Sequence, residues 1–261
     1  MPAMTIMDWV AVIGALAWTP PLFKYVKDIL TIPEVRIIAQ PSAEVGFTYL
    51  GSIFNLRMAL TVKNRDVVLT GIRIVVRHES GETREFMWQA IVQKMGQMNY
   101  PQVGAVPFEK ESGVLAIKVI QQNIEERFIR FQETTFINSK FALEQAALKK
   151  LAYLRQQGDV NYSAFLKGEE MSEVYRYIRQ STVWKQGRYT VSFELSSPEK
   201  FNVVNNQYEF HLSPVDIEAF EGNKNFIETA YVYDYIPVTE GEIRPPIPWV
   251  WRYPNLNSIG N

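Results

Sequence analysis

Histidine, glutamate and serine come together at one place in the chain, the run from His78 to Ser80. A serine nucleophile, an imidazole base and a carboxylate that orients the base are the groups with which hydrolases cleave esters and amides. The run continues an alternating pattern in which Ile74 and Val76 face inward, and adjacent residues of a strand face opposite sides. We therefore predict no relay among these residues. His78 is expected to be a hydrogen-bonded side chain at the rim of the core, and a catalytic base is the less favoured interpretation.

Other catalytic and metal-binding patterns are weak or missing. Glu125 with Glu126 and Glu169 with Glu170 are the carboxylate pairs that a glycosidase would need, but they lie in charged, solvated turns. The chain has no cysteine and two histidines, which excludes disulfides, thiolate metal sites and a cysteine nucleophile. No phosphate-binding loop, dinucleotide-binding glycine motif, nucleophile elbow or zinc-protease helix occurs. We predict no catalytic residue, no metal and no cofactor.

The best candidate for a contact surface is a group of aromatic residues near the C-terminus, Trp249, Trp251 and Tyr253. They alternate in a proline-rich tail, so in an extended chain they project to the same side. Large rings on a stiff segment suit burial against a partner, because the prolines lower the entropy lost on docking. We predict contact with a protein partner or with a second copy of the chain. The alternative is a tail that folds back along its own domain.

An apolar segment spans residues 4–26 and carries two charges, Asp8 and Lys24. As a helix it would be roughly 34 Å long, enough for a hydrocarbon core of about 30 Å. Aromatic residues at membrane interfaces flank such segments, as tryptophans do here. Pro20 and Pro21 would kink the helix. The predicted membrane anchor consists of Trp9, Val10, Val12, Ile13, Leu16 and Trp18.

Two other interpretations of this segment remain open. Residues 15–17 form an A-x-A pattern typical of a cleaved signal peptide, but Asp8 stands where a positive charge is required. A buried or partner-covered amphipathic helix is the other. If the segment spans a membrane, Lys24, Lys27 and Arg36 lie on its C-terminal side and no Lys or Arg precedes it. The positive-inside rule then predicts a single-pass protein with a cytoplasmic domain.

The rest of the chain must position these residues, and its dominant pattern is that of β-strands. From Phe54 to Val62, and again from Ile72 to Val76, apolar and polar residues alternate with the two-residue period of a strand that has one buried face. Turn residues from Asn64 to Asp66 separate the two runs. Together with a third strand that contains Phe86 and Trp88, the two runs predict an antiparallel meander of three strands. Similar alternation elsewhere brings the total to about ten strands.

The period changes to that of helices in an insertion at about 138–181. We predict one helix from Ser139 to Gln157, capped by Asn138 or Ser139 and ended by Gly158, and a second from Ser172 to Arg179. The other assignments are a long connection (Lys94 to Glu111), a short helix (Pro214 to Phe220) and a final tyrosine-rich strand (Ile227 to Ile236).

The predicted fold is mainly β, an antiparallel β-sandwich with immunoglobulin- or C2-like layering, an inserted helical hairpin and an N-terminal hydrophobic helix. The predicted units are the membrane helix with its proline kink (1–30), the sandwich (31–243) and the proline- and tryptophan-rich tail (244–261). The net charge of −1, from 27 basic and 28 acidic residues, gives no field that would recruit nucleic acid.

These features favour a membrane-anchored, non-enzymatic binding or assembly protein, whose cytoplasmic sandwich contacts protein partners or copies of itself. One alternative is an oligomeric pore-forming or membrane-perturbing effector that uses the N-terminal helix. A second is an enzyme whose site forms only in three dimensions.

Overall fold

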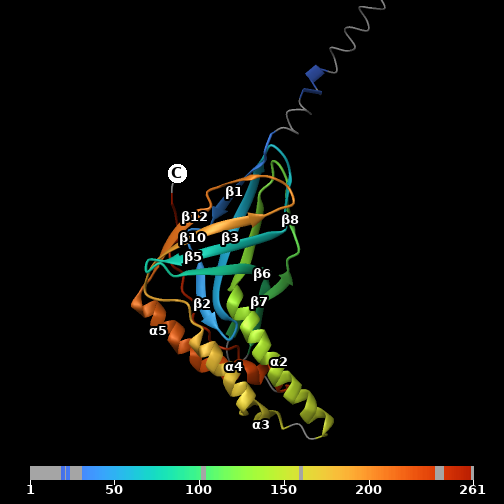
Figure 1. Ribbon diagram of the computed structural model, residues 1–261, viewed down its shortest axis with the longest axis vertical. Helices are drawn as coiled ribbons and strands as arrows, with labels where there is room; N and C mark the ends of the chain where they lie inside the picture. The colour runs from blue at the N-terminus through green and yellow to red at the C-terminus, as the bar shows by residue number, and fades with distance from the viewer. Residues whose placement is uncertain are drawn as a thin grey trace, which may run out of the picture.

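Strands and helices occupy opposite ends of the molecule in the computed structural model, which describes residues 19–20, 22–23, 31–100, 104–158, 161–238 and 244–259 (Figure 1). The predicted anchor, from Trp9 to Trp18, lies outside these residues. Within the described ranges no helix is long and apolar enough to cross a membrane.

More residues of the described chain lie in strands than in helices, as the alternating patterns predict. They are β1 (Glu34–Ala39), β2 (Glu44–Thr48), β3 (Gly51–Lys63), β4 (Val67–Leu69), β5 (Gly71–His78), β6 (Thr83–Tyr100), β7 (Gly104–Gly113), β8 (Ile117–Val119), β9 (Glu125–Glu133), β10 (Gly187–Ser196), β11 (Asn202–Val204), β12 (Gln207–Leu212) and β13 (Asn257–Ser258).

Eleven strands form a single sheet in the order β11-β1-β3-β9-β6-β5-β10-β12-β13, with β2 beside β3 and β7 beside β6. A small second sheet pairs β4 with β8. The mainly β class is confirmed, but the two-layer sandwich with immunoglobulin- or C2-like layering is not. Strand β6 pairs with both β9 and β5, so hydrogen bonding continues from one wall to the other. The sheet is also mixed, because β1 and β11 run parallel.

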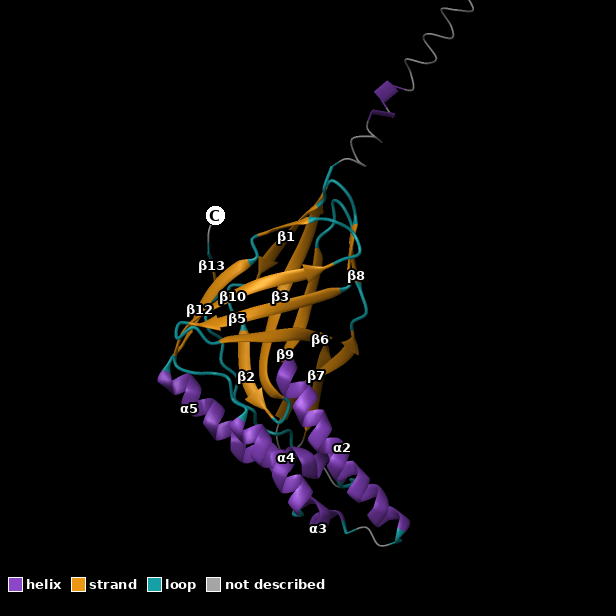
Figure 2. Ribbon diagram, viewed as in Figure 1, coloured by secondary structure: helices purple, strands orange, loops and turns teal. Residues whose placement is uncertain are grey.

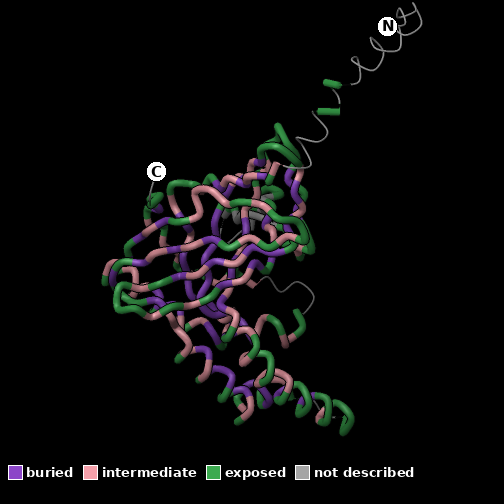
Figure 3. Tube along the Cα trace, turned by 45° about the horizontal axis from the view of Figure 1, so that its top comes forward, coloured by how far each residue is buried: buried purple, intermediate pink, exposed green. Residues whose placement is uncertain are grey.

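The sheet curls until its two ends face each other across a common core. The hydroxyl of Tyr208 in β12 donates to the backbone carbonyl of Ile37 in β1, at 3.2 Å. Between these walls the rings of Phe54 and Phe210 lie with their centroids 5.8 Å apart. Figure 3 shows the buried residues gathered inside the curl. The alternating apolar residues of β3 therefore face an interior that the sheet itself encloses.

The helices cover the end of the sheet at which β9 finishes (Figure 2). They are α2 (Thr134–Gln156), α3 (Tyr162–Leu166), α4 (Glu169–Gln180), α5 (Pro214–Asn223), the short 3₁₀ helix η1 (Lys224–Phe226) and α6 (Ile227–Tyr235). The predicted insertion is confirmed as α2 to α4, and the predicted short helix as α5, where Ser213 and Asp216 form a capping box before the first turn. Helix α2 begins five residues earlier than predicted, because the Glu133 side chain accepts the Phe136 backbone N–H.

Three sequence assignments are wrong. The predicted meander does not form, because β9 and β6 lie between β3 and β5 in the strand order. The predicted final strand is helix α6, in which Ile227, Ala230 and Tyr231 share one buried face. Its tyrosines recur every second residue, a pattern that favours a strand, but packing against the other helices outweighs this strand propensity. The predicted connection from Lys94 to Glu111 belongs to the β6-β7 hairpin, in which the register shifts between Lys94 and Gly96. Such a shift allows glycine-containing strands to pair at a sheet edge.

The C-terminal tail closes the curled sheet. Val45 and Arg252 exchange both backbone hydrogen bonds, and Leu256 donates to the carbonyl of Pro41, so the tail lies along β2. The next two residues form β13, which pairs with β12. The tail therefore connects two edges of the sheet that are far apart in the strand order.

This closure predicts the effect of a single methyl group at Gly46. A Cβ placed there would lie 2.4 Å from two ring atoms of Trp251, closer than any real contact. We expect Gly46→Ala to displace the ring and cost about 1–3 kcal/mol in the free energy of unfolding, as overpacking typically does. Thermal denaturation measures the loss. Gly222→Ala is the control, since nothing lies within 4 Å of its Cβ position, and a helical alanine there should be neutral or stabilising. Equal melting temperatures for both variants would contradict the packing of Trp251 in the tail against Gly46.

Candidate functional site

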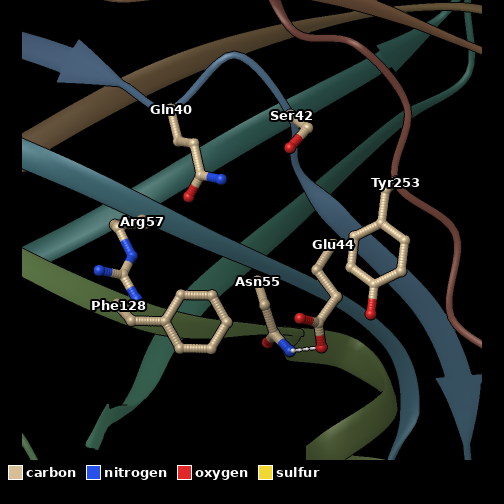
Figure 4. Close-up of a pocket in the computed structure, with 7 residues that line it drawn as sticks. All are labelled: Gln40, Ser42, Glu44, Asn55, Arg57, Phe128 and Tyr253. Carbon is tan, nitrogen blue, oxygen red and sulfur yellow. Dashed lines mark hydrogen bonds between the residues drawn. The ribbon is translucent and has the colours of Figure 1, made fainter. Parts of the chain in front are cut away.

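A polar pocket of about 340 Å³ lies on the outer face of the sheet, where the tail crosses it (Figure 4). We call it the outer pocket, and it is lined by Gln40, Ser42, Glu44, Asn55, Arg57, Phe128 and Tyr253. In β3, Asn55 and Arg57 alternate with the core residues Phe54 and Leu56, so they point outward. The register places Glu44 opposite Asn55 and Phe128 opposite Arg57.

The floor of the outer pocket is built from Asn55 and Glu44. The Asn55 amide nitrogen donates to the Glu44 carboxylate at 3.0 Å. Asn55 is completely buried, and its Oδ1 has no hydrogen-bond partner within the described structure. A buried acceptor without a donor costs about 1–3 kcal/mol. An incoming donor group would remove that cost, so the floor is suited to a ligand that donates hydrogen bonds.

The walls of the outer pocket are aromatic. Figure 4 shows the floor pair between the ring of Phe128 on one side and the ring of Tyr253 on the other. The Arg57 guanidinium also lines the pocket, and it donates to Glu126, outside the pocket, at 3.1 Å. Glu126 therefore balances the charge of Arg57, while Glu44 supplies negative charge at the floor. Anionic and carbonyl oxygens between aromatic faces are typical of a site for a cation.

The outer pocket continues into two neighbouring hollows that share Arg57. One, of about 270 Å³, includes Ile38 and Ala59, and the other, of about 530 Å³, includes Ile91 and Met95. We call the three together the outer groove. Ile38 and Met95 are about half exposed, so apolar surface lies beside the polar pocket.

The sequence candidate His78 lies elsewhere, at the rim of the core. Its Nδ1 is 2.8 Å from the Ser80 hydroxyl and its Nε2 is 3.0 Å from the Gln186 carbonyl. The alternation argument fails for Ser80, because β5 ends at His78 and a turn brings the serine back to the ring. The imidazole packs on the ring of Tyr189. Burial raises the pKa of the Tyr189 hydroxyl to about 12. No carboxylate takes the position of the Gln186 carbonyl, so these contacts form no Ser-His-acid relay.

The tryptophans of the tail contact their own domain. Trp249 stacks on Tyr49, with centroids 6.2 Å apart, and Trp251 covers Gly46. The tail thus takes the fold-back arrangement, and an association through these two rings stays a prediction. Tyr253 differs from them, because it is 62% exposed and forms a wall of the outer pocket.

A second polar cluster joins the helices to the sheet. The Lys140 ammonium lies 5.6 Å from the centroid of Tyr49 and 5.7 Å from that of Tyr231, and it pairs with Glu144 at 2.7 Å. The Tyr231 hydroxyl donates to Glu144, and burial raises the pKa of Tyr231 above its ordinary value. Burial also raises the pKa of Asp234, and the charge of Lys140 opposes that shift. Because Lys140 already occupies the space between the rings, the cluster stabilises the interface of α2 and α6.

No group of three or more His, Asp or Glu side chains that could hold a metal ion occurs in the ranges that the structure describes. Comparison of the chain with models of known protein families, with curated proteins and with solved structures gave no match in any of the three.

Sequence reasoning missed the outer pocket for a physical reason. Asn55 and Arg57 occupy the polar half of an alternating strand, which predicts solvent exposure. Glu44, Phe128 and Tyr253 come from three other segments of the chain, and only the pairing of β2, β3 and β9 with the tail brings them together. The one residue of the pocket that the sequence analysis singled out is Tyr253, as part of the candidate contact surface of the tail.

Proposed function

We propose that the protein is a membrane-tethered, non-enzymatic binding protein that holds a protein partner against the outer groove, with a basic side chain of the partner in the outer pocket. The observation that carries this proposal is the floor of the pocket. A buried carbonyl oxygen without a donor lies beside a carboxylate, and an ammonium or guanidinium group supplies hydrogen-bond donors together with a charge opposite to that of the carboxylate.

A polypeptide partner suits the shape of this surface better than a small molecule. The outer pocket opens into the two other hollows of the outer groove, where Ile38 and Met95 present apolar surface. A chain lying across the sheet would bury one arginine or lysine between Phe128 and Tyr253 and cover the apolar hollows on either side. Buried basic side chains stacked on aromatic rings often contribute much of the affinity of such contacts.

The tether is supported by the sequence of residues 4–26, which is apolar over enough length to cross a bilayer. With the groove on the following domain, the protein would recruit its partner to the membrane surface. This assigns binding rather than chemistry to the domain.

The test uses the N-acetyl amides of arginine and glutamine as probes of the pocket in saturation-transfer NMR on the full chain. We expect the arginine compound to bind and the neutral compound to bind far more weakly. Glu44→Gln keeps an acceptor for Asn55 but removes the charge, and it should weaken arginine binding roughly tenfold or more, because hydrogen bonds to charged groups contribute about 1.5–3 kcal/mol.

The matched control is Glu199→Gln, which removes an exposed carboxylate in a loop that does not line the pocket. It should leave arginine binding unchanged. The proposal is wrong if both probes bind equally well, or if the two variants reduce arginine binding to the same extent.

A further inference from the structure

Strand β1, which follows residues 1–30 in the sequence, begins at the end of the sheet opposite the helices (Figure 1). Here Asn64 donates to the carbonyl of Ile32 at 3.2 Å, and the Asn202 backbone N–H donates to that of Pro33 at 2.8 Å. The Gln121 backbone N–H donates to Asp66, also at 2.8 Å. These bonds join the start of β1 to the β3-β4 turn, the β8-β9 loop and the start of β11. We call this group of segments the entry end.

The entry end exposes isoleucines at positions where loops normally carry polar residues. Ile124 is 64% exposed, Ile32 is 51% exposed and Ile120 is 45% exposed. Ile120 and Ile124 flank a tight turn in which Gln122 has a φ of 69°. The exposed parts of these apolar side chains gain nothing from folding, so they are available for burial against another surface.

We propose that the entry end is a membrane-docking face, and that Ile32, Ile120 and Ile124 insert at the boundary between headgroups and acyl chains. The inference rests on the proposed tether. The apolar segment ends at Val26, and the five residues from there to Thr31 span at most about 18 Å when extended. If that segment enters a bilayer, the entry end is therefore confined to the neighbourhood of its surface.

The charges of the entry end show whether docking on the membrane depends on electrostatic attraction or on apolar insertion. The ranges 34–36, 63–66, 118–125 and 199–202, which form the entry end and the residues next to it, contain five basic residues (Arg36, Lys63, Arg65, Lys118 and Lys200) and four acidic ones (Glu34, Asp66, Glu125 and Glu199), a net charge of 5 − 4 = +1. Several are already paired with each other, as Lys118 is with Asp66 at 3.3 Å. Attraction to anionic lipid is therefore small, and docking depends on the isoleucines. Insertion should persist at high salt, which screens exposed charges but not apolar burial.

The absence of cysteine allows a direct test, because each introduced thiol is unique. The full-length variant Ile124→Cys is labelled with the environment-sensitive dye NBD and reconstituted in phosphatidylcholine vesicles containing nitroxide-labelled lipid. The matched control is Phe141→Cys, an apolar residue of α2 that is 60% exposed at the opposite end of β9. We expect blue-shifted emission and several-fold stronger quenching by the nitroxide lipid at position 124 than at position 141, at low and high salt alike.

Each other outcome overturns a defined part of this inference. If the full chain does not float with the vesicles, the tether is wrong and docking falls with it. If the chain floats but the label at position 124 reports water, as the control does, the tether stands and the docking face is wrong. Blue-shifted emission without lipid quenching would place a protein surface over the entry end instead of a bilayer, and would also reject the proposal.

Discussion

Leu60→Asp is expected to abolish the folded state. Leu60 is a core residue of β3 with no exposed surface. The introduced carboxylate would be buried on the inner face of the curled sheet, among apolar core residues and directly opposite Glu125, so two like charges would face each other across the strands. Burying an unpaired charge costs more than the 4–5 kcal/mol that marks an exceptional substitution, out of a total stability of about 5–15 kcal/mol. Circular dichroism and chemical denaturation should show a chain without a cooperative transition.

Thr61→Asp is the matched control, one residue along the same strand. Thr61 faces outward and is partly exposed, directly opposite Arg36 of β1. A carboxylate there meets an opposite charge across the strands, a contact that contributes roughly 0.2–1 kcal/mol. We expect stability close to that of the unmodified protein. Equal damage from the two substitutions would mean that the sheet is covered on both faces at this position.

The pair of substitutions also shows how far the sequence determines the fold. Alternation in β3 predicts which residues are buried, and Phe54, Leu56, Met58 and Leu60 are indeed completely or almost completely buried. Alternation does not say what covers that face. A second sheet and the same sheet curled on itself bury identical residues, so the sandwich was inferred where a single continuous sheet occurs.

Helices were predictable where packing and propensity agree. In α4, Met171, Val174, Tyr175 and Ile178 share one buried face at helical spacing. In α6, β-branched and tyrosine residues favour a strand, and only the position of the segment between η1 and the tail makes it helical. The outer pocket was not predictable from local patterns, because its seven residues come from three strands, the β1-β2 loop and the tail, which meet through long-range pairing.

Asn223→Asp is expected to produce the second large loss of stability. The Asn223 amide nitrogen donates to the carbonyls of Phe47, at 2.9 Å, and Val250, at 2.8 Å, and its oxygen accepts the Val250 backbone N–H at 2.8 Å. The residue is completely buried, so it connects the end of α5 to β2 and to the tail through three satisfied hydrogen bonds. Aspartate has the same shape but replaces two donors by an acceptor.

The introduced carboxylate would face two carbonyl oxygens without water, so we expect a loss of about 3–5 kcal/mol. Release of the tail should accompany it and appear as faster limited proteolysis after Val250. Asn202→Asp makes the same chemical change at an exposed position of β11 and should alter stability little. Wild-type stability in the Asn223→Asp variant would show that the tail is not held through this amide.

The pH dependence of the Asn223→Asp variant provides an independent check on that cause. Burial and the two facing carbonyls favour the neutral acid, so the pKa of the introduced carboxyl is raised in the folded state relative to the unfolded chain. A group with a raised folded pKa stabilises the fold while it is protonated and loses that contribution as pH rises through the folded pKa. The protonated acid can also donate to one of the two carbonyls. The stability difference between variant and unmodified protein, measured by urea denaturation, should therefore shrink as pH falls. A difference that stays constant with pH would mean that lost packing, and not the reversed hydrogen bonds, destabilises the variant.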